Sequence, residues 1–323
     1  MKLVLDEFKR IVFGAQRIEE IDGAIVLNRF TLGQQEFIDA NPDSVHRMEL
    51  KYKTTAGMVL DFYTNSTNLK ISVDCATSEK ELCYIDVLEN GELIAHEGYN
   101  ENANKSFTLK TSLVQGEKRV SVYLPNLFSA KITNFELDEG ASVNPYITKK
   151  NFLFHGDSIT QGYTAEYPSL SYANRIVRAF DAHCVNQAIG GAVFNPDLIG
   201  PLDFVPDKII VGYGTNDWSK GFDYTTNSLA FFEKLKKTFP NSEVVVITPI
   251  WRGNIKEKEK GTQHTFVKMC AIIKNNAVKC GFKVVNGLSI VPHSPDCFVQ
   301  DVLHPNDYGF KHYAENLYSI IKD

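Results

Sequence analysis

From residue 150 onward, short apolar runs alternate with segments of helical periodicity, and this alternation constrains the fold more than any other feature. Parallel strands buried on both faces read as continuous apolar runs, with crossover helices covering the sheet on both sides. Right-handed crossovers leave few topologies, and the simplest is a three-layer α/β/α domain with a flavodoxin-like, five-stranded parallel sheet. We expect strands over 151–155, 183–189, 208–213, 243–248 and 282–286, and helices over 168–180, 225–239, 262–280 and 306–321.

The first 145 residues have a different pattern, in which short β-rich runs are separated by turn residues. Many short strands at such spacing are typical of a β-sandwich, here of the jelly-roll kind. We therefore expect two domains, a jelly-roll-like sandwich over 1–145 and the α/β domain over 146–323, joined by a linker over 138–145. The strands are expected over 25–27, 48–53, 58–63, 69–73, 84–88, 106–109 and 119–124, and only 5–12 suggests a helix.

Composition excludes several classes of function. The net charge of -5 argues against a nucleic-acid-binding protein, which would carry a basic face. No run reaches the ~20 apolar residues of a membrane helix, and the charged N-terminus does not resemble a secretory signal. The six cysteines are scattered without zinc-ligand spacing, which favours free thiols and a cytoplasmic protein, with a Cys75–Cys83 hairpin disulfide as the alternative.

Four short polar segments follow the ends of the expected strands or precede the last helix. They are Gly-Asp-Ser at 156–158, Asn-Gln-Ala-Ile-Gly-Gly at 186–191, Gly-Tyr-Gly-Thr-Asn-Asp-Trp at 212–218 and Asp-Val-Leu-His-Pro at 301–305. Open α/β sheets bind ligands at the carboxyl ends of their strands, so we expect these segments to meet at one edge.

Ser158 is the candidate nucleophile, and a serine hydroxyl needs a base. Asp301 and His304 are three residues apart, which places both side chains on one side of a turn. The acid can then hold one imidazole nitrogen while the other faces the serine. Two alternatives remain open: Ser158 as a helix cap, and His293 as the base with Asp296 nearby.

Taken together in this order, the four segments resemble the signature blocks of the SGNH, or GDSL, hydrolase family over residues 150–323. The first block reads Gly-Asp-Ser-Ile instead of Gly-Asp-Ser-Leu, which alters no reacting group. The resemblance implies a nucleophilic serine, a base and an orienting acid, with neither a metal nor an organic cofactor. These three roles fall on Ser158, His304 and Asp301.

The same resemblance implies an oxyanion hole made by the backbone N–H groups of Ser158 and Gly191 and by the amide of Asn216. Two adjacent glycines compete for the second role, and counting from Asn186 favours Gly191 over Gly190. Glycine suits this position because its backbone N–H can approach a ligand without a side chain in the way.

A β-sandwich followed by this domain resembles carbohydrate esterase family two and related sugar deacetylases, as do segments 54–62 and 248–252. This second resemblance implies hydrolysis of O-acetyl or other short acyl esters on a small molecule or oligosaccharide. The alternatives are a general short-chain esterase, thioesterase or lipase-like hydrolase, and a carbohydrate-binding protein without turnover. The role of the sandwich is left open between glycan binding and walling the cleft.

Several side chains near the expected site have two interpretations. Trp218 and Trp251 follow strand ends, and their indole rings either stack on a sugar or pack beneath a loop. Asp157 and Asp217 are assigned to holding the fold, and strand alternation points His155 away from the serine. The charge run 256–260 is a solvated loop or a mobile flap.

Overall fold

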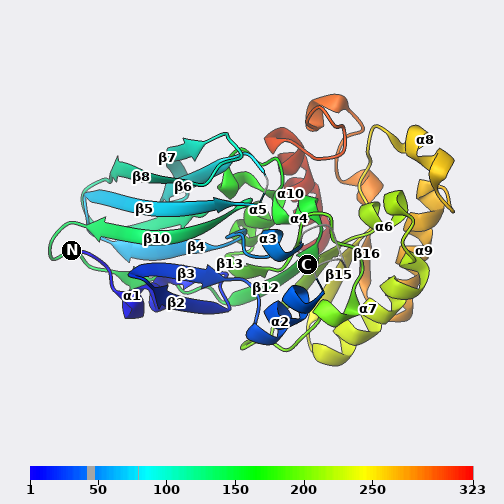
Figure 1. Ribbon diagram of the computed structural model, residues 1–323, viewed down its shortest axis with the longest axis horizontal. Helices are drawn as coiled ribbons and strands as arrows, with labels where there is room; N and C mark the ends of the chain where they lie inside the picture. The colour runs from blue at the N-terminus through cyan, green and yellow to red at the C-terminus, as the bar shows by residue number, and fades with distance from the viewer. Residues whose placement is uncertain (42–47, 79, 323) are drawn as a thin grey trace.

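A computed structural model describes residues 1–41, 48–78 and 80–322, and it has antiparallel strands at one end and a parallel sheet between helices at the other (Figure 1). The first antiparallel sheet has the order β1 (Val12–Phe13), β4 (Val59–Thr64), β9 (Lys118–Tyr123), β6 (Cys83–Glu89) and β7 (Glu92–Tyr99), with β11 (Asn144–Pro145) also paired to β4. The second has the order β2 (Arg17–Ile21), β3 (Ala24–Asn28), β10 (Phe128–Leu137), β5 (Asn68–Thr77) and β8 (Lys105–Ser112).

The two antiparallel sheets share one apolar core. Alternation in β5 turns Leu69, Ile71 and Val73 inward, where they join Leu60 of β4 and Val122 of β9. The predicted N-terminal β domain is therefore present, while its jelly-roll connectivity stays a prediction. So does the predicted boundary at residue 145, which falls between β11 and the first parallel strand.

The parallel sheet has the order β13 (Ala182–Asn186), β12 (Lys150–Gly156), β14 (Lys208–Gly212), β15 (Glu243–Ile247) and β16 (Lys283–Val285). In chain order this is 2-1-3-4-5, the flavodoxin-like arrangement, and every pair is parallel. The predicted five-stranded parallel sheet is confirmed. The chain passes from β12 to β13 on one side of β12 and then returns to β14 on its other side. The carboxyl ends of β12 and β14 therefore lie at the topological switch point.

Helices cover both faces of this sheet, giving three layers (Figure 1). α5 (Tyr172–Ala179) and α10 (Asp307–Ile321) pack on one face, and α7 (Tyr224–Thr238) and α9 (Phe266–Lys279) on the other. Successive side chains of a strand point to opposite faces of the sheet. In β12, Phe152 and Phe154 face α5 and α10, whereas Leu153 faces α7 and α9. Short helices α4 (Ser158–Gln161), α6 (Thr215–Lys220) and α8 (Ile255–Lys258) complete this half.

The described part of the N-terminal half contains three α-helices, of which only α1 (Leu5–Ile11) was predicted. α2 (Leu32–Ala40) has no counterpart in the prediction, and α3 (Met48–Lys51) replaces a predicted strand over 48–53. The strand prediction is wrong because the guanidinium of Arg29 donates to the carbonyl oxygens of Lys51 and Tyr52, which a strand would pair elsewhere. Tyr52 then packs into the core of the parallel-sheet half.

The six cysteines are free thiols, so Cys75 and Cys83 are not bridged. Within the described ranges, each helix is too short or too polar to cross a lipid bilayer.

Candidate active site

The sequence folds Ser158 into a sharp strand-to-helix turn. β12 ends at Gly156, where a side chain would collide with Thr160 and meet the carbonyl oxygen of Gly212 at 2.9 Å. Asp157 caps α4 by accepting a hydrogen bond from the Ile159 N–H at 3.0 Å, the structural role predicted for it. Ser158 is the first residue of α4, so its own N–H has no partner within the helix.

The hydroxyl of Ser158 lies 2.8 Å from Nε2 of His304, and Nδ1 of His304 lies 2.5 Å from Oδ2 of Asp301. The other carboxylate oxygen of Asp301 accepts from the backbone N–H groups of Leu303 and His304, both at 2.9 Å. Val302, inside this turn, adopts φ +47, a left-handed conformation that β-branched residues seldom take. The structure thus brings together residues 146 positions apart in the sequence.

The charge on Asp301 fixes the tautomer of His304. Burial would raise the pKa of Asp301, but hydrogen bonds from the side chain and backbone of His304 outweigh it and lower the pKa to about 2. An ionised carboxylate only accepts, so Nδ1 of His304 carries the proton and Nε2 accepts from the Ser158 hydroxyl. This is the orientation in which an imidazole can remove a serine proton.

The two glycines after β13 have different hydrogen bonds. The Gly190 N–H donates to Oε1 of Gln161 at 2.7 Å. Gly191 adopts φ +85, which favours glycine, and its N–H has no partner among the described residues. The Asn216 amide donates to the carbonyl oxygen of Ala192 at 3.2 Å, which leaves a second N–H on the same nitrogen.

Ser158 and His304 open into a pocket of about 530 Å³, which also contains Gly191 and Asn216. The 1–145 segment supplies one wall, and its residues belong to no motif, so no local pattern predicts them as part of the site. That wall consists of Lys51, Ser78, Lys80 and Leu127, and the rest of the lining is Gln161, Tyr163, Gly190 and Leu303. Across the described ranges, no three His, Cys, Asp or Glu side chains gather as a metal site.

Arg29 holds this wall against the end of β13. It is 1% exposed and donates to the carbonyl oxygens of Asn186 and Ala188, in addition to those of Lys51, Tyr52 and Thr54. Burial lowers the pKa of Arg29 to about 9, so it still carries its charge at neutral pH. The strand end that leads to Gly191 is therefore fixed by a residue of the N-terminal half.

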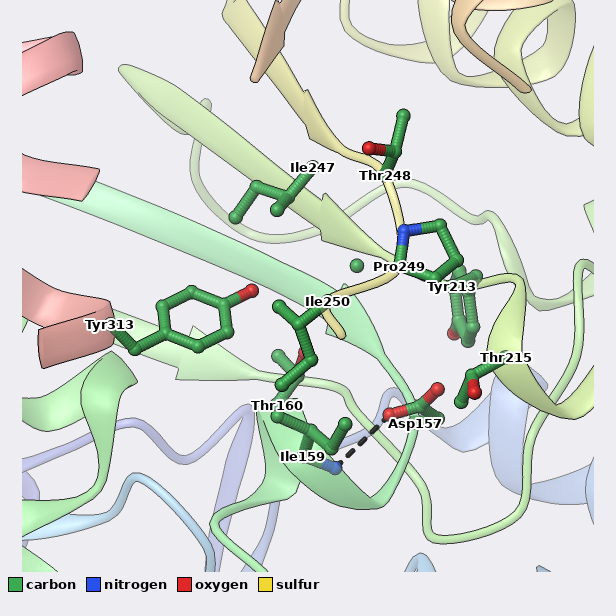
Figure 2. Close-up of a pocket in the computed structure, with 11 residues that line it drawn as sticks. Asp157, Ile159, Thr160, Tyr213, Thr215, Ile247, Thr248, Pro249, Ile250 and Tyr313 are labelled. Atoms are coloured by element: carbon green, nitrogen blue, oxygen red, sulfur yellow. Dashed lines mark hydrogen bonds between the residues drawn. The ribbon is translucent and has the colours of Figure 1, made fainter. Parts of the chain in front are cut away.

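Two buried acids support the strand ends. Asp157 lines a small cavity together with Thr215 and Tyr313 (Figure 2). Asp217 accepts from the Phe194 N–H at 3.0 Å, consistent with the fold-stabilising role predicted for it. Burial raises the pKa of each carboxyl to about 7.

Neither tryptophan reaches the pocket. Trp218 is 1% exposed, packs edge-on against Phe266 at 4.9 Å and donates from its indole N–H to the carbonyl oxygen of His264 at 2.8 Å. Trp251 stacks on His293 at 5.3 Å. Trp218 therefore packs beneath a loop, the alternative predicted for it, whereas Trp251 is only half-buried and its contact with a sugar stays a prediction.

The other candidate histidines also lie elsewhere. Nε2 of His293 is 2.8 Å from the carbonyl oxygen of Leu288 instead of near Ser158. His155 packs edge-on against Phe231 at 5.7 Å, and its burial lowers its pKa to about 3. His304 is therefore the histidine that meets the serine.

Residues 154–312 match the model of the GDSL-like Lipase/Acylhydrolase family. No curated protein matches the chain. A putative GDSL-like lipase from Bacteroides ovatus is similar in structure, with a TM-score of 0.79 at 17% identity over 100% of this chain and 97% of that one. A salicylyl-acyltransferase from a tetracycline biosynthetic pathway gives 0.76 at 20% identity over 95% and 92%. A family two carbohydrate esterase from Clostridium thermocellum, in complex with cellohexaose, gives 0.62 at 17% identity over 83% and 93%.

Proposed function

Residues 154–312 belong to the GDSL-like lipase/acylhydrolase family, and from this membership we propose that the chain is a serine esterase of O-acetyl and other short acyl esters carried by a carbohydrate. The observation that carries the proposal is the unbroken contact from Ser158 to His304 to Asp301 at the mouth of a pocket. These three side chains act as nucleophile, general base and orienting acid.

The proposed reaction is acyl transfer through an acyl-enzyme. Oγ of Ser158 attacks the ester carbonyl while Nε2 of His304 takes its proton, and Asp301 stabilises the imidazolium that results. The Ser158 and Gly191 N–H groups and the Asn216 amide donate to the oxyanion. His304 returns the proton to the leaving alcohol as the tetrahedral intermediate collapses. Water then attacks the acyl-enzyme by the same route, releasing the acid and restoring the serine.

The lining of the pocket favours a short acyl group. Leu127 and Leu303 are the aliphatic side chains among its described lining residues, and most of the others are polar or glycine. A long acyl chain needs an extended apolar surface to leave water, and each buried methylene contributes about 0.8 kcal/mol. The lining therefore supports an acetyl ester over the lipase-like alternative.

The carbohydrate part of the proposal is supported by the similarity to family two carbohydrate esterases, one of them in complex with cellohexaose. The tryptophans give it no support, because neither Trp218 nor Trp251 lines the pocket. The non-catalytic alternative, a sugar-binding protein without turnover, is disfavoured because the Ser158–His304 contact is already at hydrogen-bond distance.

A second candidate function is transfer of the acyl group to an alcohol. A salicylyl-acyltransferase of similar fold suggests it. The first half of the reaction is the same, and an acceptor alcohol replaces water in the second. Adding methanol or glycerol to the assay separates the two: an acyltransferase forms the new ester faster than free acid.

The test is acetate release from a panel of acetylated mono- and oligosaccharides, with p-nitrophenyl acetate as a general ester. Ser158→Ala should lose release on every substrate, whereas Ser228→Ala should retain it. Ser228 is a matched control because its hydroxyl is also buried, but it bonds Asn276 on the far helix layer. Release that survives Ser158→Ala, or no release from any ester, would refute the proposal.

A further inference from the structure

We propose that the alcohol part of the substrate carries a negative charge, and that Lys80 and Lys51 bind it. This inference rests on the proposed function and narrows it to acyl esters of anionic alcohols, such as a uronic acid or a sugar phosphate. Both lysines line the pocket with Ser158, and both come from the N-terminal half, which no motif of the esterase family covers.

Lys80 lies on the side of the pocket where the leaving alcohol must sit. Its Nζ is 5.0 Å from the centre of the Tyr163 ring, and that ring is 4.4 Å from the imidazole of His304. The Lys80 N–H donates to Oγ1 of Thr77 at 3.2 Å, and the same hydroxyl donates to the Lys80 carbonyl at 3.3 Å, so its backbone is held. Because His304 delivers a proton to the leaving alcohol, Lys80 is one ring away from that group.

Lys51 belongs to the same wall and lies next to the glycine pair. A side-chain carbon placed on Gly190 would lie 3.6 Å from Cδ of Lys51, so the lysine stem runs along the glycine pair beside Ser158. Arg29 fixes the backbone of Lys51 through its carbonyl oxygen at 3.0 Å. Figure 1 shows its helix, α3, where the two halves of the chain meet, beside α4.

A third lysine, Lys220, holds the glycine pair from outside the pocket lining, with Asp157 and Asp217 nearby. Nζ of Lys220 donates to the carbonyl oxygen of Gly191 at 3.2 Å, on the rim formed by α6. The described lining of the pocket contains no Asp or Glu, and the ionised Asp301 lies behind the imidazole of His304, outside that lining. The chain as a whole carries a net charge of -5, so a cationic pocket does not follow from its composition. Such a pocket concentrates anions and speeds their association.

The three proposed oxyanion donors already serve the reacting carbonyl, so the lysines are not needed there. An anion that they bind must lie beyond the ester, on the alcohol. A planar carboxylate and a phosphate share this chemistry, and lysine binds either as a point charge. The substrates in the test separate the two sources.

The test compares the monoacetates of methyl glucuronide, methyl glucoside and glucose 6-phosphate, each with its acetyl group on the same hydroxyl. We expect kcat/KM to be about tenfold higher for at least one anionic ester than for the neutral one, and to fall with added salt only for the anions. A higher kcat/KM for the acetylated glucuronide identifies a carboxylate as the bound group. A higher kcat/KM for acetylated glucose 6-phosphate identifies a phosphate. Equal or lower kcat/KM for both anions would overturn the inference while leaving the esterase proposal intact.

Variants assign the preference to the lysines. Lys80→Gln and Lys51→Gln should each reduce kcat/KM about threefold to tenfold more for the anionic ester than for the neutral one, whereas Lys80→Arg should keep most of the preference. Lys53→Gln is the matched control, since Lys53 is exposed and lies over Tyr52, outside the pocket. An equal loss on both esters would refute charge recognition. Absence of hydrolysis on all three esters and on p-nitrophenyl acetate would refute the proposed function and this inference with it.

Discussion

Oε1 of Gln161 accepts a hydrogen bond from the backbone N–H of Gly190 at 2.7 Å. The amide nitrogen of Gln161 donates to Oγ1 of Thr54 at 3.0 Å and to the carbonyl oxygen of Asn126 at 3.1 Å. One buried side chain therefore joins the helix that begins with Ser158, the glycine loop and the N-terminal half. It also favours the choice of Gly191 as oxyanion donor, because the N–H of Gly190 is already used.

Gln161→Leu should lower kcat about tenfold to hundredfold with little change in KM. The substitution releases Gly190, so the adjacent Gly191 N–H loses its fixed direction, and complete loss of one oxyanion donor costs about 10²–10³ in kcat. Steady-state kinetics on p-nitrophenyl acetate measure this. Asn276→Leu is the control, because Asn276 is also buried but bonds Thr225 and Ser228 in the helix layer away from the site, and should cost stability alone. A similar loss of kcat in both variants would contradict the positioning role.

Asp301→Asn should lower kcat by about 10²–10⁴ with KM nearly unchanged. The asparagine oxygen can still accept from the Leu303 and His304 N–H groups, so the turn remains, but its amide now donates toward Nδ1 of His304. That hydrogen bond places the imidazole proton on Nε2. A protonated Nε2 can no longer accept a hydrogen bond from the Ser158 hydroxyl. Kinetics beside a thermal melt that matches wild type measure the effect, and retention of more than a tenth of kcat would show that the acid does not set the tautomer.

Asp217→Asn should stabilise the protein increasingly as the pH rises from about 4 to 8. Burial raises the pKa of Asp217 to about 7. At pH values between the ordinary pKa of an aspartate and about 7, the folded state therefore keeps a proton that the unfolded state has lost. Folding stability therefore falls with rising pH over this window, by at most about 1.4 kcal/mol per pH unit. Urea unfolding of both proteins at several pH values measures the difference. A difference independent of pH would mean that Asp217 is ionised in the fold.

Trp218→Ala should cost about 3–5 kcal/mol of unfolding free energy because it empties a buried site, and its effects on KM should be equal for acetylated sugar and aryl acetate. The ring is enclosed by Phe266 and tied to His264, so it has no face to offer a substrate. Urea unfolding and paired Michaelis constants check this. A rise in KM confined to the acetylated sugar would restore the stacking role expected from the sequence.

The parallel-sheet half could be predicted because its information is local. Each strand is an apolar run, and the layers follow from alternation, as with Leu153 and Phe154 on opposite faces. The motif ends then meet because parallel strands share a carboxyl edge. The contact between Ser158 and His304 follows from this geometry and not from any property of the intervening residues.

The N-terminal helices could not be predicted equally well. α2 does carry a local signal, a capping box: the Thr31 N–H donates to Oε1 of Gln34, and Oγ1 of Thr31 accepts from the Gln34 N–H. α3 has none, because its alternating residues are typical of a strand, and the carbonyl oxygens of Lys51 and Tyr52 at its end accept from Arg29, which lies 22 and 23 residues earlier. The pocket wall with Lys80 was missed for the same reason, since it depends on how two halves dock.

The most direct test of the account is trapping of the nucleophile with a p-nitrophenyl alkylphosphonate, which forms a stable adduct with an activated serine. We predict a burst of one nitrophenolate per chain, loss of esterase activity in proportion, and an adduct on the peptide that contains Ser158, with no burst from Ser158→Ala. Labelling of another residue, or an undiminished burst from Ser158→Ala, would contradict the claim that His304 activates Ser158.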